Sequence, residues 1–318
     1  MSASNETYNL SVFCIKNIRL DSFLADIFKH YSRSTISTWI KSGEVLLNAK
    51  KIIKPNTKVN FQDTITITIK ESYHNQEWEK QDIKLDIIFE DDHIMVINKP
   101  AFLTVHPGAG QANSTLANAL YFYNEQLSLL PRMGIVHRLD KDTSGIMVVA
   151  KTTLAQTSLV AQLQDRSVSR TYHAIVIGNI IAGGTIETDI GRDPKRRTAM
   201  AVVYEGKHAI THYRVLNKFD NFTLVEAKLE TGRTHQIRVH MAHIKHPLVG
   251  DQTYGKRTIS AKTPEQLKAF LLNFKRQALH AKHLKFIHPF SGEEVEFECP
   301  YPNDFKELLN LMPREQDL

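Results

Sequence analysis

A polar stretch at residues 71–84 divides the sequence into two differently patterned parts. It is rich in charged and amide side chains and has no helical or strand periodicity, which is typical of a linker. The whole chain of 318 residues is long enough for two domains. We therefore expect an N-terminal extension at 1–17, a small domain at 18–75, a linker at 76–84 and a large domain at 85–318.

The small domain has the pattern of two short helices followed by strands. Its first helix is predicted from apolar residues that recur at helical spacing. These residues are Leu20, Phe23, Leu24, Ile27 and Phe28. A second helix is expected to begin at Ser32 or Ser34, either of which can cap it, and to end at Gly43. The alternation in 63–69 predicts a half-buried strand.

The positive charge of the chain is concentrated in its first 70 residues. They contain ten of the 40 Lys and Arg residues but only five of the 34 Asp and Glu residues, and thus nearly all of the net charge of +6. A concentrated basic face attracts polyanions, among which nucleic acids are the commonest. On charge alone, an ordinary solvated surface remains the alternative.

The large domain contains more strand-like than helix-like segments. Two strands are predicted within 86–99. Further strands are predicted at 145–150, 171–177, 208–215, 223–229 and 235–240. Helices are predicted at 114–123, 153–165 and 263–274, the last with capping-box spacing from Thr263 and proline in its first turn. Because helices and strands do not alternate regularly, we expect an α+β fold with a mixed, largely antiparallel sheet.

The densest group of reactive side chains lies at 137–144, between two apolar strand-like runs. Loops held by buried strands are where active sites are often built. Asp140 lies between Arg138 and Lys141, whose charges favour an ionised carboxylate. Such a carboxylate can act as a nucleophile or as a base. A salt-bridged turn with no catalytic role is the alternative.

A second dense group contains Arg233, His235 and Arg238, after a glycine that permits close approach at a turn. Arginine makes forked contacts with carboxylates and phosphates, but these arginines could also satisfy the ends of strands. His240, His243 and His246 follow at a spacing that is not a strong metal signature.

Two further patterns favour less specific interpretations. The glycine-rich segment 108–115 lacks the Gly-Lys-Ser/Thr ending of a phosphate-binding loop, so a turn is the better interpretation. The two aspartates at 140 and 142 superficially resemble those of aspartyl-phosphate enzymes, but His137 and Arg138 interrupt the apolar strand that precedes the aspartates in those enzymes.

The small number of cysteines and the lack of a signal peptide or a long apolar run indicate the cellular compartment. Cys14 and Cys299 lie at opposite ends of the chain and cannot form a disulfide framework or a cysteine zinc cluster. The first residues lack the pattern of a signal peptide, and no apolar run approaches the roughly 20 residues that span a bilayer. We expect a cytoplasmic protein with no membrane association.

Resemblances to two known families make the expected function more specific. Residues 18–70 resemble the S4-like RNA-binding domain, through the segments that begin at Arg19, Ser32, Trp39, Val45 and Lys54. Most of 85–300 resembles the RluA family of pseudouridine synthases. The matching segments begin at Asp91, Asn98, Val105, His137, Arg170 and Thr231. Four strings, at Pro107, Asp140, Thr211 and Met241, are most similar to the branch of the family that modifies the large ribosomal subunit.

The family resemblance implies an isomerase that converts uridine to pseudouridine in RNA without a cofactor or metal. It implies that Asp140 is the essential aspartate, that Tyr172 stacks on the target base and that Arg233 pairs with Asp140. Arg138 would fill the gap left by a flipped nucleotide. RNA-binding residues expected in the small domain are Arg19, Arg33, Lys41, Lys50, Lys51 and Lys54.

The branch resemblance implies 23S rRNA as the partner, free or in pre-50S or 50S particles, with uridines of helix 69 as targets. We expect the enzyme to act as a monomer. Two other classes remain as alternatives: a non-catalytic RNA-binding or ribosome-assembly factor, and a metal-dependent hydrolase that uses the histidine group.

Overall fold

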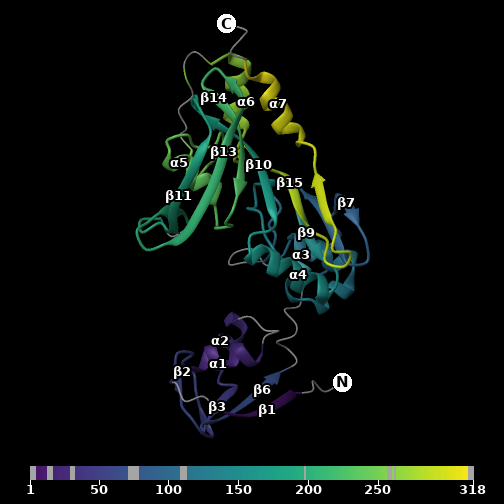
Figure 1. The fold of residues 1–318 in the computed structure, drawn as a ribbon, viewed down its shortest axis with the longest axis vertical. Coiled ribbons are helices and arrows are strands. Elements are labelled where there is room, and N and C mark those ends of the chain that lie inside the picture. The colour runs from purple at the N-terminus through teal and green to yellow at the C-terminus, as the bar shows by residue number, and fades with distance from the viewer. Residues whose placement is uncertain are drawn as a thin grey trace. The chain divides into compact units, whose positions relative to one another are not determined.

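The computed structural model describes most of the chain and divides it into two compact units, Met1–Glu79 and Lys80–Leu318 (Figure 1). The described residues are 5–12, 17–28, 33–70, 79–107, 113–196, 198–255, 260 and 263–313. Predictions that concern Cys14, the Ser32 cap and the glycines at 108 and 110 lie outside them.

A strand lies within the segment expected to be an N-terminal extension. β1 (Asn5–Ser11) pairs antiparallel with β6 (Thr64–Lys70), which makes it the edge of a four-stranded sheet in the order β1-β6-β3-β4. The other elements are β2 (Ile18–Arg19), α1 (Leu20–Ile27), α2 (Arg33–Ser42), β3 (Val45–Leu47), β4 (Lys50–Lys51) and β5 (Lys58–Val59). Part of the segment expected as an extension is therefore integral to this sheet.

The core of the first unit lies between the two helices and the sheet. Trp39 is completely buried, and Leu20 and Leu24 of α1 pack in the same cluster. The apolar face predicted for α1 is narrower than expected, because Ile27 at its end is exposed. This core is built from residues of the first unit alone, so the unit has its own hydrophobic stabilisation.

The second unit is organised around a large twisted sheet in the order β12-β11-β13-β14-β10-β15-β9-β8-β7, with β16 paired to β15 (Figure 1). Its strands are β7 (Ile87–Glu90), β8 (Ile94–Lys99), β9 (Ser144–Ala150), β10 (Ser169–Ile177), β11 (Gly184–Arg192), β12 (Met200–Val202), β13 (Lys207–Phe219), β14 (Phe222–Leu229), β15 (Leu279–Ile287) and β16 (Glu294–Glu298). Among these strands the pairing is antiparallel except between β9 and β15. The predicted α+β class is confirmed.

Five α-helices and two 3₁₀ segments are described in the second unit. They are α3 (Leu116–Tyr123), η2 (Glu125–Leu129), η3 (Pro131–Gly134), α4 (Thr153–Gln164), α5 (Gln236–His243), α6 (Glu265–Asn273) and α7 (Asn303–Leu311). The three predicted helices are present, although α6 begins after Pro264 without a side-chain cap. In the described part of the chain, no helix has both the length and the apolar composition to cross a membrane.

The strand predicted at 235–240 is wrong, because this segment begins helix α5. His235 adopts a left-handed backbone conformation (φ 58°) that ends the extended path after β14. Gln236 then fixes the turn, because its Oε1 accepts hydrogen bonds from the backbone N–H of Arg233 and the hydroxyl of Thr231. The alternation of apolar and polar residues was misleading, since Arg238 and His240 are buried as well.

Candidate active site

Asp140 lies in a loop that is fixed at the start of the most deeply buried strand. All seven residues of β9 are buried, and the backbone N–H of Thr143 donates to the carbonyl of Asp140 across the loop (3.1 Å). Gly145 has φ 119° where β9 meets β15, and an added Cβ would collide with the carbonyl of Ala281. Only glycine allows these two strands to approach so closely.

A buried lysine forms a hydrogen bond with the backbone of the loop. Lys99 is 1% exposed, and its Nζ donates to the carbonyls of Pro100 (2.7 Å), Leu103 (2.9 Å) and Lys141 (3.1 Å). Burial lowers the pKa of Lys99 to about 7, while the charge of Asp140 opposes this change. The three carbonyl acceptors match the three N–H donors of an ammonium group.

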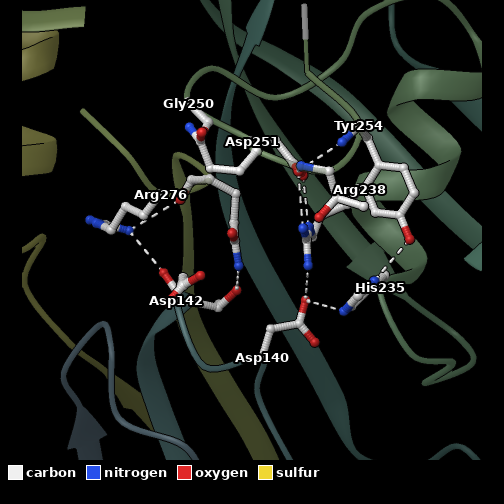
Figure 2. Close-up of polar contacts among 12 residues, drawn as sticks. Asp140, Asp142, His235, Arg238, Gly250, Asp251, Tyr254 and Arg276 are labelled. Atoms are coloured by element: carbon white, nitrogen blue, oxygen red, sulfur yellow. Dashed lines mark hydrogen bonds and ion pairs between the residues drawn. The ribbon is translucent and has the colours of Figure 1, made fainter. Parts of the chain in front are cut away.

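Two residues that precede β15 also form hydrogen bonds with the loop. Gln277 donates from Nε2 to the hydroxyl of Thr143 (3.0 Å), and Arg276 donates to the carbonyl of Asp142 (3.4 Å) (Figure 2). Arg276 is 1% exposed and forms a two-point ion pair with Asp304 of α7. The loop is therefore bonded to two separate segments of the second unit, Lys99 and residues 276–277, which limits its motion.

Arg238 connects the Asp140 carboxylate to a second, buried carboxylate (Figure 2). Its Nη1 donates to Oδ2 of Asp140 (3.0 Å), while Nε and Nη2 donate to the two oxygens of Asp251 (2.7 and 3.0 Å). The prediction that Arg233 pairs with Asp140 is wrong. Since α5 starts at Gln236, Arg238 is carried to Asp140 on its first turn, whereas Arg233 donates from Nε to the carbonyl of His208 (3.0 Å).

The electrostatics of this arrangement keep Arg238 charged. Burial opposes the charge, but the hydrogen bonds and negative charges of Asp251 and Asp140 outweigh it and raise the pKa of Arg238. Burial likewise acts to raise the pKa of Asp251, yet Arg238 and the backbone N–H groups of Tyr254 and Thr253 lower it overall. The other carboxylate oxygen of Asp140, Oδ1, accepts no hydrogen bond from the described residues.

His235 and Tyr254 lie beside Arg238, and His235 approaches the same oxygen of Asp140 (Figure 2). Nε2 of His235 is 3.9 Å from Oδ2 of Asp140, and its Nδ1 is 2.8 Å from the hydroxyl of Tyr254. Burial lowers the pKa of His235, against the influence of Asp140, so the imidazole is neutral near pH 7. The Tyr254 ring also packs under the Arg238 guanidinium at 5.1 Å.

Tyr172 comes from β10, which is separated from β9 by β15, and is 7% exposed. Burial raises the pKa of its phenol, and Asp140 raises it further, while Arg170 lowers it. The sheet register places Tyr172 opposite Ala281 of β15 and Ala281 opposite Gly145 of β9, just beyond the Asp140 loop. Two of the three residues predicted as catalytic, Asp140 and Tyr172, are thus brought to one site, and Arg238 takes the place expected of Arg233.

The remaining predicted RNA-binding residues are on the surface. Arg138 is exposed two residues before Asp140. In the first unit, Arg19 forms a two-point ion pair with Asp21, and Arg33 donates to the hydroxyl of Ser22 (2.6 Å). The exposed lysines Lys41, Lys50, Lys51 and Lys54 have no carboxylate partner among the described residues.

Two histidines of the sequence motifs, His137 and His240, form hydrogen bonds within the fold. Nε2 of His137 accepts the backbone N–H of Val148 (3.1 Å), and burial lowers the pKa of His137 to about 3. Both ring nitrogens of His240 bond to threonine hydroxyls, at Thr211 (2.8 Å) and Thr188 (3.1 Å). Both ring nitrogens of His240, and Nε2 of His137, are therefore already used in hydrogen bonds within the fold.

Comparison with known proteins identifies the second unit. The family model described as RNA pseudouridylate synthase matches residues 93–243. The chain is 52% identical to ribosomal large subunit pseudouridine synthase D of Vibrio cholerae over 94% of this chain and 93% of that protein. It is 51% identical to the Escherichia coli O157:H7 protein of the same name over 92% and 90%. The chain belongs to the RNA pseudouridylate synthase family.

The predicted synthase and S4 domains are both confirmed. The S4 domain model matches residues 18–65. Two human structures resemble the synthase unit: RNA pseudouridylate synthase domain containing 1 has a TM-score of 0.56 at 28% identity, covering 73% of this chain and 89% of that one. Domain containing 4 has a TM-score of 0.57 at 25% identity, covering 72% and 95%.

Some residues of the synthase site could have been found from the sequence and others could not. Asp140, Tyr172 and Arg238 lie within the matched span, and Arg238 was noted as one of two neighbouring arginines. Asp251 and Tyr254 lie beyond that span. Their signal in the sequence is weak, because a buried aspartate and a tyrosine in a turn have no distinctive spacing from Asp140.

Proposed function

We propose that this RNA pseudouridylate synthase isomerises uridines of 23S rRNA in the helix 69 stem-loop, with Asp140 as the essential residue. The relatives with about half of their residues identical are named as synthases of the large ribosomal subunit. The S4 domain suits a large structured RNA, as do its exposed lysines, which have no carboxylate partner among the residues that the structure describes. The observation that carries the role of Asp140 is its ion pair with Arg238, in which the Asp140 side chain keeps 19% of its surface exposed.

The reaction breaks the N–C glycosidic bond of uridine, rotates the uracil and rejoins it to the ribose through carbon. Atoms are rearranged without net oxidation or hydrolysis, so the protein must supply charge, orientation and proton transfer. Arg238 holds one oxygen of Asp140 and stabilises the carboxylate as an anion, which leaves Oδ1 for the substrate. An anion fixed in this way is suited to act as a nucleophile or as a base.

Tyr172 and Arg138 provide the contacts that a flipped nucleotide needs. The buried phenol of Tyr172 is neutral near pH 7 because burial raises its pKa, so its ring can stack on the uracil without adding charge. Arg138 is exposed beside Asp140 and can occupy the space that the nucleotide leaves. Flipping costs a few kcal/mol, and less from a loop than from a paired stem.

Asp140→Asn tests this assignment directly. The change removes the charge but little volume, so we expect no turnover and nearly unchanged affinity for RNA. Asp92→Asn is the matched control, because Asp92 is exposed in the turn between β7 and β8. Chemical mapping of pseudouridine after incubation with 23S rRNA, tRNA and an isolated helix 69 stem-loop measures activity and substrate together.

The outcomes test the role of Asp140 and the identity of the substrate separately. Pseudouridine formed by Asp140→Asn would contradict the role of Asp140. Modification of tRNA alone, with 23S rRNA unmodified, would contradict the substrate and leave the enzyme class unchanged.

A further inference from the structure

His235 directly precedes helix α5, yet its side chain does not cap the helix. This position is most often taken by Ser, Thr, Asp or Asn, whose side chain accepts a backbone N–H of the first turn. His235 has a left-handed backbone here (φ 58°), and its side chain forms no such hydrogen bond. A residue other than glycine adopts this conformation only at a cost in free energy. The imidazole is therefore available for contacts away from the helix end.

The contacts of Tyr254 decide which nitrogen of His235 carries the ring hydrogen. The hydroxyl oxygen of Tyr254 accepts the backbone N–H of Met200 (2.8 Å) and lies 2.8 Å from Nδ1 of His235 (Figure 2). A phenol has one hydrogen to donate, and Nδ1 of His235 is its acceptor within the described part of the chain. Because Nδ1 accepts this hydrogen bond, the hydrogen of the neutral imidazole is on Nε2.

Nε2 of His235 lies beside the Asp140 carboxylate. It is 3.9 Å from Oδ2 of Asp140, too far for a hydrogen bond, and that oxygen already accepts Nη1 of Arg238 (3.0 Å). The side chain of His235 is 20% exposed, so it can be reached from solvent. Burial lowers the pKa of His235, as do Arg238 and Arg138, against the charges of Asp140 and Asp251. The imidazole therefore stays a neutral donor and does not form a charged pair with Asp140.

We propose that the Nε2–H of His235 donates a hydrogen bond to a carbonyl oxygen of the target uracil as the N–C glycosidic bond breaks. The inference rests on the proposed role of Asp140, which brings the reacting nucleotide against that carboxylate and so beside Nε2. When the bond breaks, its electron pair stays on the uracil and is shared with the carbonyl oxygens. A neutral imidazole can stabilise this charge without giving up its proton, as preorganised donors do at other oxyanions. His235 is then a catalytic residue in addition to Asp140.

Two amide substitutions that differ by one methylene group test this contact. The amide nitrogen of His235→Gln can occupy the place of Nε2, whereas the shorter side chain of His235→Asn cannot reach it. Asparagine tolerates the left-handed backbone and caps helices well, so this variant should fold. In single-turnover reactions of the full chain with the RNA that the wild type modifies, we expect His235→Asn to be slower by about 10²-fold. His235→Gln should lose less than about tenfold, because it keeps a neutral donor.

RNA affinity and a second histidine distinguish this role from a general loss of structure. The dissociation constant of each variant for the RNA should stay within about twofold of the wild type, because the contact strengthens only as charge develops. His173→Asn is the matched control, since Nδ1 of His173 also bonds to a tyrosine hydroxyl, that of Tyr301. His173 follows Tyr172 on β10, and successive side chains of a strand point to opposite faces. We expect His173→Asn to keep the wild-type rate, with thermal melting to show that all variants are folded.

Sulfur substitution in the RNA tests whether the contact is made to the uracil itself. A thiocarbonyl accepts hydrogen bonds more weakly than a carbonyl, so either 2-thiouridine or 4-thiouridine at the target position should slow the wild type. His235→Asn lacks the donor and should lose little more from the same substitution. The effects of the protein and RNA changes are therefore expected to be non-additive for one of the two thiouridines.

The outcomes separate the inference from the proposed function. A wild-type rate in His235→Asn, or equal losses in His235→Asn and His235→Gln, would overturn the inference. Additive effects with both thiouridines would also overturn it, and so would a loss in His173→Asn equal to that in His235→Asn. A wild-type rate in Asp140→Asn would contradict the proposed function, while a slow His235→Asn with non-additive thiouridine effects would still support the histidine contact.

Discussion

Arg238 donates to Asp140 from the one guanidinium nitrogen that Asp251 leaves unused. Nε and Nη2 are occupied by the buried Asp251, whose side chain is completely inaccessible, and Nη1 reaches Oδ2 of Asp140 at 3.0 Å. Asp251 therefore orients Arg238, and Arg238 orients the carboxylate proposed to be catalytic. The planar shape of the guanidinium is essential to this geometry, since an ammonium has no fixed fork.

Arg238→Lys should lower kcat for pseudouridine formation by about 10²-fold, by analogy with the loss of one preorganised charged contact in an active site. Lysine keeps the charge but cannot bind both carboxylates in the same geometry. Single-turnover kinetics would measure the effect. Arg233→Lys is the control and should have a much smaller effect, because Arg233 bonds to a backbone carbonyl. A larger loss in Arg233→Lys would restore the original expectation from the sequence.

The titration of Lys99 predicts a dependence of stability on pH. Its pKa is about 7 in the folded protein, while an unfolded lysine titrates near 10.4. Between these values the unfolded chain binds more protons than the folded one, so stability from this residue increases as the pH rises from about 7 to about 10. The difference in unfolding free energy between wild type and Lys99→Met, measured in urea, should therefore grow over this range.

A difference that does not change with pH would contradict this prediction. It would mean that the three carbonyl acceptors keep Lys99 protonated well above neutral pH. At pH 7 we expect Lys99→Met to be less stable than the wild type by about 3 kcal/mol, because it leaves the carbonyls of Pro100, Leu103 and Lys141 without their donor.

Secondary structure that depends on local periodicity was predicted correctly from the sequence. Features that depend on tertiary contacts were predicted wrongly. The strands 145–150 and 223–229 and the helix 153–165 follow from periodicity, and Asp140 follows from its flanking cations and the family motif. The helical state of 235–240 does not follow from periodicity, because the segment is buried on all sides and its alternation mimics a strand. The choice of Arg238 over Arg233 depends on where that helix begins.

Alanine substitution of two glycines separates two causes of lost stability: a steric collision of the added Cβ and a left-handed backbone conformation. Gly145→Ala should destabilise the protein by more than about 3 kcal/mol, because it combines a left-handed backbone with a collision against the Ala281 carbonyl. Gly292→Ala should cost about 1 kcal/mol, since Gly292 has φ 73° but no atom within 4 Å of an added Cβ. Denaturant unfolding of both variants would measure the difference, and equal losses would contradict the collision.

Removal of residues 1–79 should leave a folded synthase. The core of the first unit contains only residues from that unit, and the Asp140, Arg238 and Tyr172 group lies entirely in 80–318. The deletion removes the lysines that have no carboxylate partner in the described structure, so we expect weaker RNA binding and a smaller salt slope, with pseudouridine formation still detectable at high enzyme concentration. Thermal melting and the near-ultraviolet circular dichroism of the truncated protein would show that it is folded. An affinity and a salt slope equal to those of the full chain would mean that the basic surface of the first unit is only solvated and does not contact the substrate.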